Sequence, residues 1–135
     1  MTLHVELLMP DRSLWSGEAG LVIAKTMDGD IGVMPGHSPL FGILSPGSVV
    51  RIREVPGDDN SGDVVRAAVR DGFLSVASDR VSILASVAEL AAEVNAEAAQ
   101  ADMDEAAAEG GVSVEESPDY RYARARLLAA DPQAS

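Results

Sequence analysis

The stretch GDIGVMPGHSPL, residues 29–40, carries more structural information than any other part of this 135-residue chain. It contains three glycines, two prolines and one of the two histidines of the sequence. Glycine reaches backbone angles that other residues avoid, while proline fixes φ and removes a hydrogen-bond donor. Apolar runs flank the stretch at residues 21–24 and 41–44. This composition predicts a shaped loop that projects from a β framework and forms a contact surface, although a structural corner without a partner has the same composition.

Around this stretch, as far as residue 87, short runs of alternating apolar and polar residues are separated by turn residues. The period-two alternation of half-buried strands occurs at residues 3–7, 50–53 and 64–69. The pair Asp71-Gly72 lies between two strand-like runs and predicts a hairpin with a type I′ turn. Short strands at such close spacing predict a small β-sandwich or barrel.

Beyond residue 87 the pattern takes the period of a helix. Apolar residues recur at steps of three and four, at Val87, Leu90, Ala91, Val94, Ala98 and Ala101. Gly110-Gly111 predicts the end of this helix, and Ser117-Pro118 predicts the start of a second one, because serine is a good N-cap and proline is favoured at the first helical position. The second helix has a modest apolar stripe at Tyr120, Ala123, Leu127 and Ala130. We therefore expect a β domain at residues 1–87 and a weakly held antiparallel helical hairpin at residues 88–135, with a linker at about 109–118.

The charge of the chain excludes several kinds of partner. The formal net charge is −12. Residues 1–87 hold eleven acids and seven bases, a net of −4, and residues 88–135 hold eleven acids and three bases, a net of −8. Such an acidic chain argues against nucleic acid and against direct docking on anionic lipid. Because no run of eighteen apolar residues and no basic-then-apolar leader is present, we expect no membrane insertion and no secretory signal.

Residues suited to catalysis or metal binding are few. The chain has no cysteine, and its two histidines show no metal-ligand spacing, so we expect no metal and no cofactor. His37 could act as a base beside Asp28 or Asp30, but a histidine in such a loop more often bonds a nearby carbonyl, so we expect no catalytic residue. The acids of the first helix fit a solvated face or pairing with Arg121 and Arg124; a calcium site would need a looped geometry that they lack.

Three blocks of the sequence together resemble one family. Residues 29–40 resemble the signature of the ε subunit of rotary F-type ATP synthases in bacteria. DGFLSVASDRVSILASVAELAAEVN, residues 71–95, resembles the last two strands of that family and the start of its first C-terminal helix. LHVELLMPDRSLWSGEAGLVIAKT, residues 3–26, resembles its opening strands. The resemblance extends over about residues 2–98.

The resemblance implies a non-catalytic rotor subunit on the central stalk of a proton-translocating complex, peripheral at the cytoplasmic face of the cell membrane. In the family, the β-sandwich is a clamp between the γ subunit and the c-ring. The residues that match the ring-facing loop are Gly29, Asp30, Ile31, Gly32, Pro35, Gly36 and His37. The hairpin of the family folds against the sandwich or extends along γ, where it restrains ATP hydrolysis through the α and β subunits. Its basic contacts would come from Arg121, Arg124 and Arg126.

The same resemblance also bears on whether the first C-terminal helix binds ATP. Many bacterial ε subunits carry an Ile/Leu-Asp-x-x-Arg-Ala motif that binds ATP, and the matching positions are Val94, Asn95, Ala98 and Ala99. The acid has become asparagine and the arginine has become alanine, which removes the charge and the paired donors that a phosphate would use. We therefore expect no tight ATP site on this helix. From the residues alone, the alternative is a stand-alone β-sandwich module that binds a ligand or peptide and has an acidic helical tail.

Overall fold

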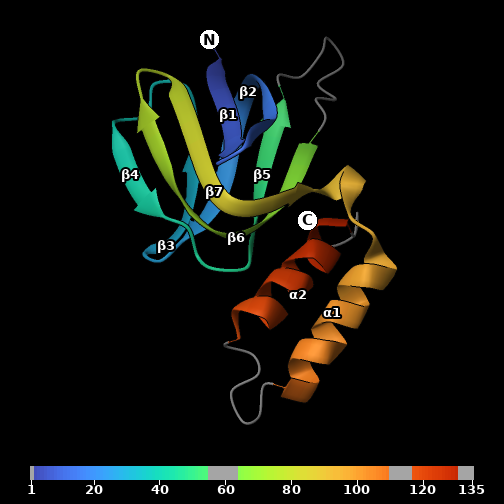
Figure 1. Cartoon of the computed structure of the whole chain (residues 1–135). Helices are drawn as coiled ribbons and strands as arrows, with labels where there is room; N and C mark the ends of the chain where they lie inside the picture. The colour runs from blue at the N-terminus through green and yellow to red at the C-terminus, as the bar shows by residue number, and fades with distance from the viewer. Residues whose placement is uncertain (1, 55–63, 110–116, 131–135) are drawn as a thin grey trace.

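The computed structural model of the chain describes residues 2–54, 64–109 and 117–130. Strands come first and two α-helices follow (Figure 1), which confirms the predicted order of a β domain and a helical hairpin. The strands are β1 (Leu3–Met9), β2 (Arg12–Thr26), β3 (Gly29–Val33), β4 (Leu40–Ile43), β5 (Ser48–Glu54), β6 (Val64–Ala77) and β7 (Arg80–Leu90). They are followed by the short 3₁₀ helix η1 (Ala91–Glu93), α1 (Ala96–Glu109) and α2 (Pro118–Ala130).

The strands form the predicted sandwich because the sheet closes on itself. Its order is β1-β7-β6-β5-β2-β3, and β1 also pairs with β2, so five strands make a closed ring with β3 and β4 attached at its edges. The 15-residue strand β2 makes this closure possible: its first half pairs with β1, and its second half pairs with β5 and β3. The register shifts between Ala19 and Leu21, where β2 passes from one layer to the other.

The core of the sandwich consists of large aliphatic side chains. Alternate residues of β1 point inward, as expected for a strand with one buried face. The largest side chains that are fully buried include Leu3, Leu7, Leu44, Ile52, Leu74 and Ile83. Every residue of this core cluster comes from the first 88 residues of the chain. The sandwich therefore encloses its own core without help from the helices.

The helical hairpin packs on one side of the sandwich, with α2 against β5 and β6 and α1 against α2 (Figure 1). Its fully buried side chains in the residues that the structure describes are all alanines: Ala99, Ala106, Ala123, Ala125 and Ala129. Ala125 and Ala129 meet Val49 and Ala68 of the sheet. The predicted stripes were partly wrong, since Ala98 and Ala101 are exposed and Ala99 and Ala106 face inward.

The first helix begins later than its pattern predicted. β7 continues to Leu90, so Val87 and Leu90 are strand residues and the strand crosses the expected boundary at residue 87. Pairing with β6 holds this end of β7 extended, because Ala67 lies opposite Leu90 and Val69 opposite Ala88. The start of α2 is as predicted: the Tyr120 amide donates to the Ser117 hydroxyl at 3.5 Å. Gly110-Gly111 and most of the expected linker lie outside the described residues.

The predicted hairpin at Asp71-Gly72 was wrong. β6 runs straight through this pair, and the chain turns at Ser78-Asp79, whose φ angles are 51° and 60°. Gly72 instead lies in a bulge where the register with β7 shifts, and a Cβ there would collide with the carbonyl oxygen of Leu84. The glycine is therefore needed for close approach between strands, whereas the turn tolerates two non-glycine residues at positive φ.

Candidate protein-interaction surfaces

The residues predicted to face the c-ring do not form one loop. Gly29, Asp30, Ile31 and Gly32 belong to the edge strand β3, which pairs with β2 through Lys25 opposite Asp30. Only residues 34–39 connect β3 to β4 as a loop. The prediction of a single projecting loop was therefore wrong for its first half, because an edge strand accepts glycines that a central strand would not.

The two halves of the predicted site lie at opposite ends of the sandwich (Figure 1). The Gly36 amide donates to the Asp79 carboxylate at 2.6 Å, and Asp79 lies in the turn between β6 and β7. Asp30 lies next to the β2–β3 turn, and the five residues of β3 span about 15 Å at roughly 3.3 Å per residue. The structure therefore does not bring Asp30 and His37 together.

His37 has the structural contact that its sequence context favoured. Its Nδ1–H donates to the carbonyl of Ser38 at 2.7 Å. The described residues hold no group of three or more His, Cys, Asp or Glu side chains that could bind a metal. Neither helix in the described part of the chain has the length and apolar character that a membrane span requires.

A row of apolar side chains, exposed except for the half-buried Leu8, crosses four strands on the outside of the sandwich. Its members are Leu8 of β1, Leu84 of β7, Phe73 of β6 and Ile43 of β4, and each is the register partner of the next. Phe41 extends the row, with its ring centroid 5.2 Å from that of Phe73. Ile43 and Phe41 are 59% and 63% exposed. We call these five residues the apolar row.

Beside the apolar row is a groove of about 340 Å³, lined by Leu8, Met9, Pro10, Asp71, Gly72, Phe73, Leu84, Ala85 and Ser86. A contiguous apolar surface with a groove is typical of a protein-interaction site. Sequence reasoning missed it. The sequence signal that could have revealed it is LFGIL, residues 40–44, because a strand that is apolar on both faces must expose one apolar face unless a partner covers it. In the structure only Gly42 and Leu44 of this segment are buried.

One side of α2 is held by ion pairs. The Arg126 guanidinium contacts the Asp102 carboxylate at 2.8 Å and the Glu89 carboxylate at 3.5 Å, and its side chain is 12% exposed. Burial lowers the pKa of Arg126, but the hydrogen bond with Asp102 and the charge of Glu89 raise it more. Arg70 of β6 contacts Asp119 at 2.6 Å. The arginine that pairs with the first helix is therefore Arg126, and not Arg121 or Arg124 as one interpretation expected.

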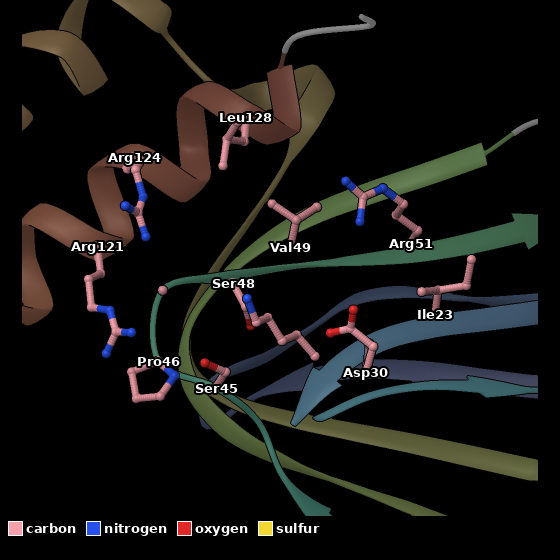
Figure 2. Close-up of a pocket in the computed structure, with 13 residues that line it drawn as sticks. Ile23, Asp30, Ser45, Pro46, Ser48, Val49, Arg51, Arg121, Arg124 and Leu128 are labelled. Carbon is pink, nitrogen blue, oxygen red and sulfur yellow. The ribbon is translucent and has the colours of Figure 1, made fainter. Parts of the chain in front are cut away.

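The other side of α2 carries Arg121 and Arg124. Both line a cavity of about 280 Å³ between α2 and the sandwich, and Asp30 lies on its opposite wall. Figure 2 shows the two arginines extending from α2 toward the loop that carries Pro46, with Asp30 across from them. Nothing in the sequence indicated that Asp30 and the arginines of the second helix share one cavity, because β3 and α2 are about 90 residues apart.

The residues that match the nucleotide motif have structural roles. The Ala98 amide donates to the Asn95 side-chain oxygen at 3.0 Å, and the Ala99 amide donates to the Asn95 carbonyl at 2.9 Å. Asn95 is therefore the N-cap of α1. Ala99 is fully buried, while Ala98, at the position of the missing arginine, is exposed. Val94 precedes the cap and belongs to neither helix.

Comparisons with known proteins agree with the architecture. The model of the "ATP synthase, Delta/Epsilon chain, beta-sandwich domain" family matches residues 2–91. An ATP synthase epsilon chain from Thermobifida fusca is 51% identical over 95% of this chain and 91% of its own length. Another from Streptomyces avermitilis is 50% identical over 88% of this chain and 91% of its own length.

A solved structure shares the fold. A chain in the mitochondrial ATP synthase of Euglena gracilis, solved with OSCP, F1 and c-ring, superposes with a TM-score of 0.68 at 17% identity, over 93% of this chain and 75% of that one. These comparisons favour a rotor subunit over the stand-alone module. The chain therefore belongs to the delta/epsilon family of ATP synthase, as a non-catalytic subunit of the complex.

Proposed function

We propose that the sandwich clamps the γ subunit to the c-ring and rotates with both, so that proton flow through the ring drives ATP synthesis in the catalytic α and β subunits. In this role the protein is peripheral, at the cytoplasmic face of the cell membrane. The observation that supports the proposal best is the apolar row. Large apolar side chains that stay exposed on a well-packed sandwich favour a lasting protein partner, because each loses contact with water when the partner binds.

We assign the apolar row to γ. The row runs across four adjacent hydrogen-bonded strands, so a partner bound there would contact all four at once. The test is co-purification with γ. Phe73→Ser should abolish the complex in size-exclusion chromatography, whereas Leu128→Ser, at an apolar residue of similar exposure on α2, should leave it intact. If Phe73→Ser still co-elutes with γ, the row is not the γ surface.

We assign the turn beside Asp30 to the c-ring, with Gly29 and Ile31 as its neighbours. A carboxylate can form charge-assisted hydrogen bonds, which are directional and therefore resist shear during rotation. Pro35, Gly36 and His37 lie at the other end of the sandwich and would face γ or solvent instead. Asp30→Arg should uncouple proton pumping from ATP synthesis while the sandwich stays folded, because Asp30 is not part of the core. Glu93→Arg provides the same change of charge far from this turn, and normal coupling in both variants would contradict the assignment.

We propose that the hairpin is a detachable regulator of ATP hydrolysis. To reach the catalytic subunits, Arg121 and Arg124 must leave the cavity beside the sandwich, and Arg126 must release Glu89 of β7 while it can keep Asp102 of α1. The many acids of α1 oppose contact with acidic partners, so we expect weak inhibition. A chain that ends at residue 93 keeps all of β7 and should still bind γ, with only a small rise in ATP hydrolysis. A large rise would contradict weak inhibition, and loss of γ binding would mean that the helices help to form the γ surface.

A further inference from the structure

The cavity between α2 and the sandwich holds one acidic side chain among four basic ones. Its charged lining residues are Lys25 and Arg51 of the sandwich, Arg121 and Arg124 of α2, and Asp30 of β3. Asp30 lies on the wall opposite the two arginines of α2 (Figure 2). The lining therefore carries four positive charges and one negative charge, in a chain whose net charge is −12.

The basic groups of this cavity have few local partners. In the described part of the chain, Lys25, Arg121 and Arg124 form no ion pair with a carboxylate. The Nε of Arg121 is buried and has no hydrogen-bond partner among the described residues. Arg51 has an interaction within the chain, but it is still a cation beside the same cavity. The like charges of the two walls therefore repel each other, and Asp30 is the acid among the lining residues that offsets this repulsion.

The opposite side of α2 has paired charges instead. Arg126 contacts Glu89 of β7 and Asp102 of α1, and Arg70 of β6 contacts Asp119 of α2. The contacts to Glu89 and from Arg70 join the hairpin to the sheet, so charge favours docking on that side. On the cavity side, charge opposes docking except through the one acid of the lining. The position of the hairpin is therefore sensitive to a single carboxylate that lies outside the hairpin.

We infer that Asp30 couples the docking of the hairpin to the contact with the c-ring. In the docked state its carboxylate attracts the two arginines of α2. A cationic group of the ring that pairs with Asp30 cancels this negative charge, so repulsion across the cavity then favours release of the hairpin. The coupling is reciprocal, because docked arginines weaken the hold of Asp30 on a cationic partner and their release strengthens it. The coupling rests on the proposed c-ring contact, whereas the dependence of docking on Asp30 does not.

The test is amide hydrogen exchange in residues 118–130 of the isolated full chain. Asp30→Asn removes the charge but keeps the size of the side chain, and should accelerate this exchange about two- to fivefold, the range expected for a partly screened charge interaction. Lys25→Gln removes a cation from the same wall and should slow the exchange by a similar factor. Adding Arg124→Gln to Asp30→Asn removes one of the repelling arginines, and should bring the exchange back toward the wild-type rate.

Asp11→Asn and Arg80→Gln are the matched controls, because they remove one exposed acid and one exposed base that do not line the cavity. Exchange in β1 should stay unchanged in every variant, which checks that the sandwich remains folded. Shifts of the same sign in Asp30→Asn and Lys25→Gln, or rates equal to those of the controls, would overturn the inference. So would a difference that persists in about 1 M sodium chloride, where charges are screened beyond about 3 Å.

A second measurement, on the assembled complex, separates the coupling from the ring contact. Exchange in residues 118–130 should be faster with γ and the c-ring bound than with γ alone. Equal rates would overturn the coupling if Asp30→Arg uncouples proton pumping as proposed above. Normal pumping in Asp30→Arg would instead overturn the ring contact, and the isolated chain would still decide whether Asp30 holds the hairpin.

Discussion

The sandwich and the helical hairpin are held together by different forces. The sandwich buries leucine, isoleucine and valine side chains from six strands in one continuous core. In its described residues the hairpin buries only alanines, and it relies on Arg126 and Arg70 to join its helices to each other and to the sheet. A fully buried large aliphatic side chain contributes about 1.5–3 kcal/mol, and a methyl group about 0.8 kcal/mol or less.

This difference supports the proposal that one small chain combines a rigid part with a detachable part. The sandwich keeps its shape because its core does not include any helical residue. If the hairpin leaves, as proposed, little apolar surface is exposed, because its buried residues in the described part are alanines. Regulation by a moving element requires such a small energy gap between its two positions.

The largest expected effect is in the sandwich core. Leu74 is fully buried, so Leu74→Ala should cost about 2–5 kcal/mol of unfolding free energy through lost burial and a cavity. Leu128→Ala, on a residue of α2 that is 44% exposed, should change it by less than about 0.5 kcal/mol. Urea unfolding followed by circular dichroism measures both. Equal costs would mean that the hairpin is as well packed as the sandwich.

The next effect separates the hairpin from the sandwich. Gly47 has a φ of 65°, and a Cβ there would lie 2.6 Å from the backbone carbon of Arg121 in α2. Gly47→Ala should therefore push α2 away and accelerate amide hydrogen exchange in residues 118–130. Gly36→Ala imposes a comparable backbone strain at a φ of 90° with open space around its Cβ, and should leave exchange in α2 unchanged. Faster exchange in α2 in both variants would show that strain in the sandwich, and not the collision, releases the helix.

A smaller effect concerns the ion pairs within the hairpin. Arg126→Gln removes contacts to Asp102 and Glu89 from a side chain that is only 12% exposed, and should weaken hairpin docking by about 1.5 kcal/mol. Hydrogen exchange in α1 and α2 should rise, while that in β1 should not change. Arg12→Gln, an exposed arginine at the start of β2, is the control. If Arg126→Gln exchanges like wild type, alanine packing alone holds the helices.

The smallest effect depends on pH. Burial, reinforced by the charge of Glu89, raises the pKa of Tyr122 above its ordinary value near 10. Since the folded-state pKa is the higher one, the stabilisation is fully present below about pH 10 and is lost as the pH rises through the folded-state value. Hydrogen exchange in α2 should therefore show an alkaline transition that Tyr122→Phe abolishes and Tyr120→Phe retains. A transition that persists in Tyr122→Phe would assign it to another group.

Much of the fold could be predicted from local patterns. Period-two alternation identified the β domain, and Ser117-Pro118 identified the start of α2, because both signals depend on neighbours in the sequence. The prediction of a hairpin at Asp71-Gly72 was wrong because the role of this pair depends on a distant segment of the chain. Its glycine is required by the carbonyl of Leu84 on the next strand, a contact that no local pattern contains.

The sequence by itself determined the family, the order of strands and helices, and the absence of the acid and arginine of the nucleotide motif, because these depend on residue identity and spacing. Only the tertiary structure decided where the functional residues meet. It separated Asp30 from His37 by the length of β3, aligned the apolar row across four strands, and placed Asp30 opposite Arg121 and Arg124. Strand register and helix docking arise from contacts between distant segments, so no local periodicity could have specified them.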